Sequence, residues 1–205
     1  GYALRSTMNK IPGLSLQNEP YIDQWGREQA SLDGTDDSAG GMFLRGAYNM
    51  LSPGYIRQEN IPPVDEYLQG LYGSTNDSGV FPEKASNSVT VDSKKYYLTP
   101  EEKTQYAKTR GQISYDAVDS LRQNSLFLQL PEDQQNEIVK DVYSVAKTVG
   151  GVAAVGDGVS GTNSKAYQAY EQGGIPMLEN YLLADSAVKG AGASLQADVA
   201  RELLN

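Results

Sequence analysis

Carboxylate, lysine and tyrosine side chains are the groups of this chain that could do catalytic chemistry. Two sets of carboxylates lie next to a tryptophan or a double proline. Asp23 and Glu28 flank Trp25, and Asp65-Glu66 follows a double proline. Two carboxyl groups held roughly 5 to 10 Å apart can hydrolyse a glycoside. The chain has 26 acidic residues, so pairs at that separation also arise by chance, and surface ion pairs or helix-end carboxylates are the favoured interpretation. We assign no catalytic residue from the sequence.

The composition excludes the mechanisms that depend on histidine or cysteine. The chain contains neither residue, so it cannot form a disulfide, a zinc site of the usual thiolate or imidazole kind, or a triad with histidine as base. Asp33, Asp36 and Asp37 could gather a hard cation such as calcium through oxygen ligands. They lack the order of an EF-hand loop, so we interpret them as a solvated acidic loop and expect no metal site.

A glycine-rich stretch at 150–158 has some likeness to a phosphate-binding loop. A Walker loop ends in Gly-Lys-Ser/Thr, so that its lysine reaches the phosphates. Here Asp157 follows Gly156, and its carboxylate would repel a phosphate. The stretch also follows an expected helix rather than a strand. We therefore interpret it as a linker or a turn between helices, and expect no bound cofactor.

The charge balance and the tyrosine content indicate which partners suit the chain. A formal net charge of −9 without a basic stripe argues against nucleic acid and against an anionic membrane surface as partners. No apolar run approaches the length of a membrane span. There are 14 tyrosines against 3 phenylalanines. Clusters such as Tyr96-Tyr97 and Tyr167 with Tyr170 could form a binding groove for a peptide or a sugar, although half-buried packing is the commoner role of tyrosine.

The hydrophobic pattern predicts a mainly α fold: an irregular helical domain with a small β-hairpin and a C-terminal set of short helices. The clearest signal is Thr99-Pro100-Glu101-Glu102, which matches a capping box with proline at the first helical position. The hairpin is predicted near residues 89–98, where β-branched and aromatic residues flank a polar turn. The predicted helices cover residues 42–51, a segment from Pro62-Pro63 to Gly73, 99–124, 131–149, 164–172, 176–189 and 195–204.

The pattern also predicts how the chain is organised. Four apolar residues from Ile138 to Val149 follow a 4-3-4 spacing that indicates a core-facing stripe, and Gly150-Gly151 is expected to end their helix. We therefore expect a helical body over residues 1–150. Residues 151–205 would form a glycine-rich joint and C-terminal helices, which either pack on the body or reach a neighbour.

A few residues are expected to hold the loops of the body in place. Trp25 with Gly26 would fix a loop onto the helices, because glycine permits a close approach of two backbones. Trp25, Tyr21 and Tyr67 are the predicted structural anchors. We predict no catalytic, cofactor-binding or metal-binding residue.

A series of turn and helix-start motifs runs through residues 8–150. The motifs are Ile11-Pro12-Gly13-Leu14, the segment from Glu19 to Glu28, Asn49-Met50-Leu51-Ser52-Pro53-Gly54, Pro63-Val64-Asp65-Glu66-Tyr67-Leu68, Val80-Phe81-Pro82, and Tyr97-Leu98-Thr99 followed by Glu101. Their order and spacing resemble one of the large polyvalent protein-associated domains, which occur in giant multidomain phage proteins, tape-measure proteins and ejected virion proteins. The resemblance implies a non-catalytic domain and brings no catalytic residues with it.

These observations lead to one expectation and two alternatives. We expect a non-catalytic structural or interaction domain, a fragment of a phage or prophage virion-associated polyvalent protein. Its partners would be other segments of the same large protein or virion proteins, and its location the virion or the bacterial cytoplasm. The first alternative is a carboxylate-dependent hydrolase acting on cell-wall glycan, with two facing acids in a cleft. The second is a tyrosine-rich module that binds a peptide or small ligand in a pocket lined by Tyr96, Tyr97 or Tyr106.

Overall fold

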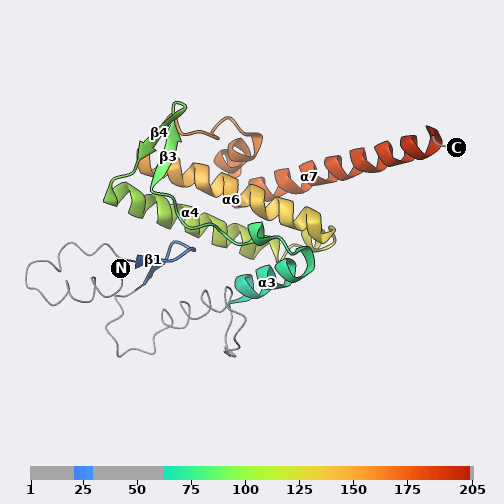
Figure 1. The fold of residues 1–205 in the computed structure, drawn as a ribbon, viewed down its shortest axis with the longest axis horizontal. Helices are drawn as coiled ribbons and strands as arrows, with labels where there is room; N and C mark the ends of the chain where they lie inside the picture. Colours follow the sequence, from blue (N-terminus) through green and yellow to red (C-terminus); the bar gives the residue numbers. More distant parts are fainter. Residues whose placement is uncertain (1–20, 30–61, 204–205) are drawn as a thin grey trace, which may run out of the picture.

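The computed structural model describes residues 21–29 and 62–203 (Figure 1). Within these residues the chain is mainly α-helical with a small β-hairpin, so the predicted fold class is confirmed. The expected helix at 42–51 and the acidic loop at 33–37 lie outside the described residues. The elements are β1 (Tyr21–Ile22), β2 (Glu28–Gln29), α3 (Pro63–Thr75), the short 3-10 helix η2 (Ser78–Val80), β3 (Ser88–Val91), β4 (Lys94–Tyr97), α4 (Pro100–Leu121), α5 (Ser125–Leu128), α6 (Glu132–Val155) and α7 (Lys165–Leu203).

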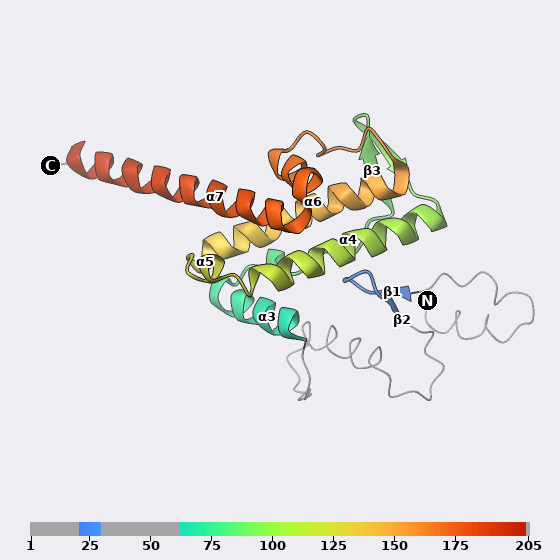
Figure 2. The ribbon, with the colours of Figure 1, turned by 180° about the vertical axis from the view of Figure 1, so that it is seen from behind.

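Helices α4 and α6 form the centre of the molecule, where they run antiparallel and side by side (Figures 1 and 2). α4 begins with the predicted capping box: Thr99 Oγ1 accepts a hydrogen bond from Glu102 N at 3.3 Å, and Glu102 Oε2 accepts one from Thr99 N at 2.8 Å. α6 begins after Pro131 and carries Glu132 and Asp133 in its first turn. Carboxylates there stabilise the exposed N–H groups of the helix end. Both predicted helix starts are confirmed.

The hydrophobic core lies between α3, α4, α6 and the adjoining part of α7. On α6, the stripe residues from Ile138 to Val145 are at most 3% exposed, and Val149 is partly buried against the same cluster. On α7, Leu178 and Leu182 belong to that cluster as well. Burial of these apolar side chains therefore holds the first half of α7 onto the body.

The predicted helix end at Gly150-Gly151 is wrong, because α6 continues through both glycines to Val155. A Cβ atom at Gly150 would lie 3.0 Å from Arg110 Cβ and 3.0 Å from Tyr106 O. Glycine here lets α4 and α6 approach closely, and that packing outweighs the low helix propensity of glycine. The boundary expected at residue 150 falls inside this helix.

The C-terminal region forms two helical segments instead of three short helices. α7 breaks at Gly173 and Gly174, where φ/ψ are −154°/19° and 64°/−151°. The predicted helix end at residue 172 is therefore confirmed. The expected interruption at Gly190 is wrong, because the helix continues through it to Leu203. A glycine in αR geometry leaves the ladder of backbone hydrogen bonds intact, so its presence alone does not end a helix.

Helix α3 begins at Pro63, as predicted, and ends two residues later than expected. It runs past Gly73 to Thr75. Asn76 then adopts a left-handed φ of 52° and donates its N–H to Tyr72 O, which is a common way to terminate a helix. The predicted apolar face of α3 packs into the core.

The predicted hairpin is formed by β3 and β4, which pair antiparallel with Val91 opposite Lys94. Asp92 and Ser93 make the turn with φ values of 46° and 63°, the geometry of a type I′ turn. The loop that follows α6 lies along the outer edge of β3, where Val91 and Val159 form an isolated bridge. The glycine-rich joint is therefore attached to the hairpin.

Candidate functional site

A tight turn between β1 and β2 places Asp23, one of the two carboxylates that flank Trp25, next to α4. Asp23 Oδ1 accepts hydrogen bonds from the backbone N–H groups of Trp25 (2.9 Å) and Arg27 (2.8 Å), and Asp23 Oδ2 lies 3.1 Å from Arg27 Nε. Asp23 thus fixes the shape of the turn. The side chains of Tyr21 and Glu28 lie outside the described residues, although their backbones pair in β1 and β2.

Two glycines let the backbone of this turn touch the backbone of α4. Gly26 has a φ of 77°, which favours glycine. A Cβ atom at Gly111 would lie 2.6 Å from Gly26 Cα, and a Cβ atom at Gly26 would lie 2.9 Å from Lys108 Cα. Neither position has room for a side chain, because the neighbouring atoms belong to the main chain.

Trp25 inserts from this turn into the core and is 0% exposed. Its Nε1 donates a hydrogen bond to Asp65 Oδ1 at 3.2 Å. Its ring packs nearly perpendicular to that of Tyr115, with the ring centroids 5.5 Å apart. Burial raises the pKa of Asp65, while the hydrogen bond from Trp25 and the charge of Arg27 act in the opposite direction. The structure therefore brings Asp23 and Asp65 to the same tryptophan, where both have structural partners.

Tyr67 is partly buried against the core, and Tyr106 is fully buried. The Tyr67 hydroxyl donates a hydrogen bond to Gln135 Oε1 at 2.9 Å, and its ring packs against Phe127 with a centroid distance of 6.1 Å. Burial raises the pKa of Tyr67 well above its ordinary value. Tyr106 is 0% exposed. The Tyr67 hydroxyl is therefore bonded within the protein, and the Tyr106 hydroxyl is shielded from solvent.

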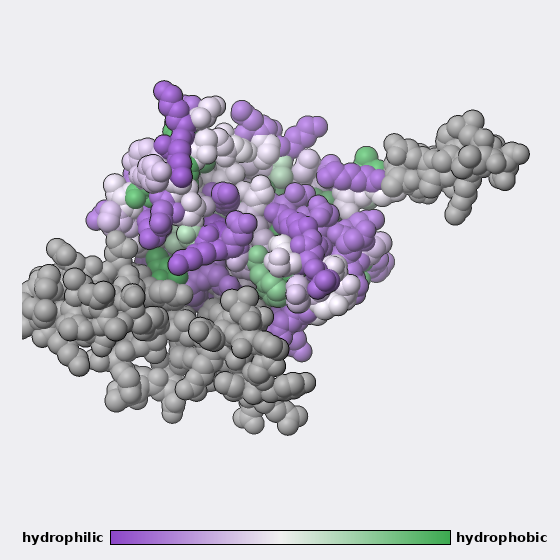
Figure 3. Space-filling view, in the orientation of Figure 1, coloured by the Kyte–Doolittle hydropathy of each residue, from purple (hydrophilic) through white to green (hydrophobic). Residues whose placement is uncertain are grey.

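A groove of about 750 Å³ lies between the end of α3, the first half of α6 and α7. Its walls include Ile138 from α6 and Leu182 from α7. Six carboxylates line it: Asp77, Glu132, Asp133, Glu137, Asp141 and Asp185. We call it the acidic groove. No tyrosine lines it, and the face of the molecule seen in Figure 3 is mostly hydrophilic with small, separate apolar patches.

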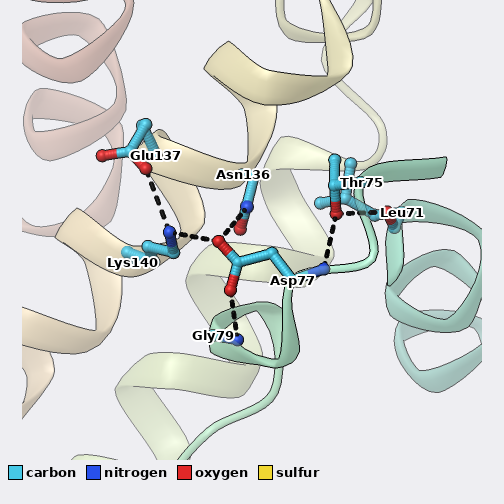
Figure 4. A network of polar contacts seen from close by, with 7 residues as sticks. All are labelled: Leu71, Thr75, Asp77, Gly79, Asn136, Glu137 and Lys140. Carbon is cyan, nitrogen blue, oxygen red and sulfur yellow. Dashed lines mark hydrogen bonds and ion pairs between the residues drawn. The ribbon is translucent and has the colours of Figure 1, made fainter. Parts of the chain in front are cut away.

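Asp77 connects η2 to α6 at one end of the acidic groove (Figure 4). Its Oδ2 accepts hydrogen bonds from Lys140 Nζ at 2.7 Å and Asn136 Nδ2 at 3.0 Å, and its Oδ1 accepts one from Gly79 N at 2.8 Å. These donors, with Lys140 the strongest, lower the pKa of Asp77 to about 2. Glu137 Oε1 lies 3.0 Å from Lys140 Nζ. The network fixes the loop after α3 onto α6.

The other end of the acidic groove lies between α6 and α7. Asp185 pairs with Lys189 at 2.7 Å on α7. Asp141 on α6 faces this pair, and partial removal of water from its carboxyl raises its pKa; Lys189 opposes the shift, whereas Glu137 and Asp185 add to it. The carboxylates of this groove thus interact across two helices.

Sequence reasoning missed the acidic groove because its walls come from three separate segments. Asp77, Asn136 and Asp141 are between 5 and 64 residues apart in the chain, so no local motif joins them. The one local signal was on α6, where Asn136, Glu137 and Lys140 have the i, i+1 and i+4 spacing of one helical turn.

Among residues 21–29 and 62–203, no group of three or more acidic side chains is arranged to hold a metal ion. No helix in the same residues is long and apolar enough to cross a membrane. Comparisons with protein-family models, with curated proteins and with solved structures find no match for this chain.

Proposed function

We propose that this chain is a non-catalytic interaction domain that holds a basic segment of a partner protein in the acidic groove. The observation that carries the proposal is the charge of the groove, in which six carboxylates outnumber two lysines: Lys189 in the groove wall, and Lys140, which pairs with Asp77 and Glu137. A lysine- or arginine-rich segment would be attracted to such a surface.

Part of the acidic charge has an ordinary structural cause. Glu132 and Asp133 lie in the first turn of α6, where carboxylates stabilise a helix N-terminus. Asp141 and Asp185 lie further along, away from any helix start. Their charge is not explained by helix capping and is therefore the better probe of binding.

The biological setting of the proposal comes from the sequence motifs. Their resemblance to large polyvalent protein-associated domains supports a fragment of a phage or prophage virion-associated protein, located in the virion or the bacterial cytoplasm. The basic segment would then belong to another part of the same large protein or to a virion protein.

Binding of a short fluorescein-labelled peptide of alternating lysine and leucine tests the groove. We expect fluorescence anisotropy to show binding at low salt that weakens at about 0.5 M salt, where charges are screened over roughly 3 to 5 Å. Asp141→Lys should weaken it about tenfold, because one attraction is replaced by one repulsion. Glu101→Lys makes the same charge change on α4, outside the groove, and should leave the affinity within about twofold. Equal weakening in both variants, or no binding at all, contradicts the proposal.

A carboxylate-dependent hydrolase of cell-wall glycan is the second candidate, and the raised pKa of Asp141 favours it. Its possible partner acids are already in ion pairs, Glu137 with Lys140 and Asp185 with Lys189. Release of reducing sugar from purified peptidoglycan is the assay. Turnover by the wild type that is lost in Asp141→Asn and kept in Asp133→Asn would establish the hydrolase. Its absence in the wild type dismisses it.

A further inference from the structure

Within the described residues, one outer edge of the β3–β4 hairpin is hydrogen-bonded to a loop and the other outer edge is not. The outer edge of β3 is occupied, since Asp92 N donates to Gly158 O and Ser160 N donates to Thr90 O, each at 2.9 Å. β4 pairs with the opposite edge of β3, so it lies across the hairpin from this loop. Within the described residues, no segment pairs with the outer edge of β4.

The register shows which backbone groups point to that open edge. In an antiparallel pair, hydrogen-bonded and non-hydrogen-bonded positions alternate. Leu98 N donates to Asn87 O at 3.0 Å, so Tyr96 and Lys94 are the bonded positions of β4. Lys95 and Tyr97 are the alternate positions, opposite Thr90 and Ser88.

The loop on the outer edge of β3 gives independent support for the orientation of the backbone groups of β4. Thr90 uses its carbonyl to accept from Ser160, on the side away from β4. The residue opposite Thr90 is Lys95, so the backbone N–H and C=O of Lys95 also point away from the partner strand. Tyr97, two residues on, has the same orientation.

The side chains of β4 are exposed along the whole strand. Tyr97 is 69% exposed, and Lys95 Nζ lies 4.9 Å from the centroid of its ring. Lys94 adds a second positive charge beside the turn. In a chain of net charge −9, this short strand therefore offers two lysines, two exposed tyrosine rings and two residues with open backbone groups.

We propose that β4 is a docking edge for an extended acidic peptide segment, which adds to the hairpin as a third strand. The backbone of Lys95 and Tyr97 would bond the peptide main chain. The two lysines would attract its carboxylates, and Tyr97 would contact an apolar side chain between them. This surface is separate from the acidic groove, and it takes a partner segment of opposite charge.

A short lysine-bearing edge strand also discourages unwanted strand pairing. If protection is the role of β4, acidic and basic extended peptides should both fail to bind. The docking proposal requires that the acidic peptide binds and that the basic one does not. The two roles are therefore distinguished by one pair of ligands.

The experiment uses the full chain and a fluorescein-labelled peptide of alternating glutamate and valine, with the lysine–valine peptide as its counterpart. Tyr97→Pro removes the outward N–H of residue 97 and leaves the hairpin bonds of Tyr96 and Leu98 in place, because proline is tolerated at an edge position of this kind. Tyr97→Ala removes the ring and keeps the N–H. Anisotropy should show moderately weaker binding for Tyr97→Ala, and about tenfold weaker binding still for Tyr97→Pro.

Two matched charge-reversal variants complete the test. Lys95→Glu should abolish detectable binding of the acidic peptide, whereas Lys147→Glu, an exposed lysine on α6, should leave it within about twofold. Circular dichroism confirms that each variant is folded.

Equal affinities of Tyr97→Ala and Tyr97→Pro would overturn the added-strand geometry. Equal effects of the two lysine variants, or no binding of the acidic peptide to the wild type, would overturn the docking edge. Asp141→Lys should retain the acidic peptide, which separates this result from the groove.

Discussion

Gly111→Ala is the sharpest test of how the β1–β2 turn is held on the body. The added methyl group would lie 2.6 Å from Gly26 Cα, and its other close neighbours are also main-chain atoms. Since no side chain can move aside, the turn has to lift off α4. Trp25, which is 0% exposed, would then leave the core.

The expected change in the free energy of unfolding follows from two opposing contributions. Loss of a buried tryptophan from a core costs about 3 to 5 kcal/mol, and alanine in place of a helical glycine returns about 1 kcal/mol. Gly111→Ala should therefore lower the free energy of unfolding by about 2 to 4 kcal/mol. Gly70 is the matched control, because it lies in a helix and a Cβ added there would have no neighbouring atom within 4 Å. Gly70→Ala should raise the free energy of unfolding by up to about 1 kcal/mol.

The assay is favourable because Trp25 is the only tryptophan of the chain. Its fluorescence reports on the turn alone, and urea unfolding gives the stability of each variant. Gly111→Ala should show red-shifted emission and easier quenching by acrylamide, while Gly70→Ala should match the wild type. Unchanged emission in Gly111→Ala, together with the same gain in stability as Gly70→Ala, would refute the backbone contact between the turn and α4.

Two carboxylates should give opposite pH dependences. Burial raises the pKa of Asp65 above 3.8 in the folded protein, so its stabilising contribution is present below that pH and is lost as the pH rises through the raised value. Asp65→Asn should therefore flatten the fall in stability as the pH rises above about 4. The pKa of Asp77 is lowered to about 2, mainly by Lys140, so its contribution is present above 3.8 and is lost as the pH falls toward 2. Asp77→Asn should be less stable than the wild type at neutral pH and should converge with it in acid. Urea unfolding across the pH range measures both, and a profile parallel to that of the wild type would contradict the corresponding assignment.

Local signals in the sequence were sufficient where a few neighbouring residues decide the structure. The capping box at Thr99 and Glu102 and the hairpin around Asp92 and Ser93 are of this kind, since the residues that pair lie at most nine positions apart. The helix break at Gly173 follows equally from a local signal.

Glycine is misjudged from sequence where distant packing decides its role. Gly150 is expected to end a helix, but its close neighbours are Arg110 and Tyr106, about 40 residues earlier in the chain. The same holds for the candidate sites. Trp25 meets Asp65 across 40 residues, and Asp77 meets Lys140 across 63. Such pairings depend on how α3, α4 and α6 pack, which periodicity alone does not specify.

The attachment of the glycine-rich joint to the hairpin has a consequence for the order of folding. Ser160 bonds Thr90 across roughly 70 residues, and closing so long a loop costs entropy before any contact offsets it. Contacts within the antiparallel α4–α6 pair span shorter separations, about 40 residues for Arg110 and Gly150. Formation of this pair shortens the loop between Thr90 and Ser160. We therefore expect α4 and α6 to pack together early in folding. The hairpin of β3 and β4 would acquire its contacts with the loop after α6 late. Weakening the joint would then accelerate unfolding and leave the refolding rate nearly unchanged.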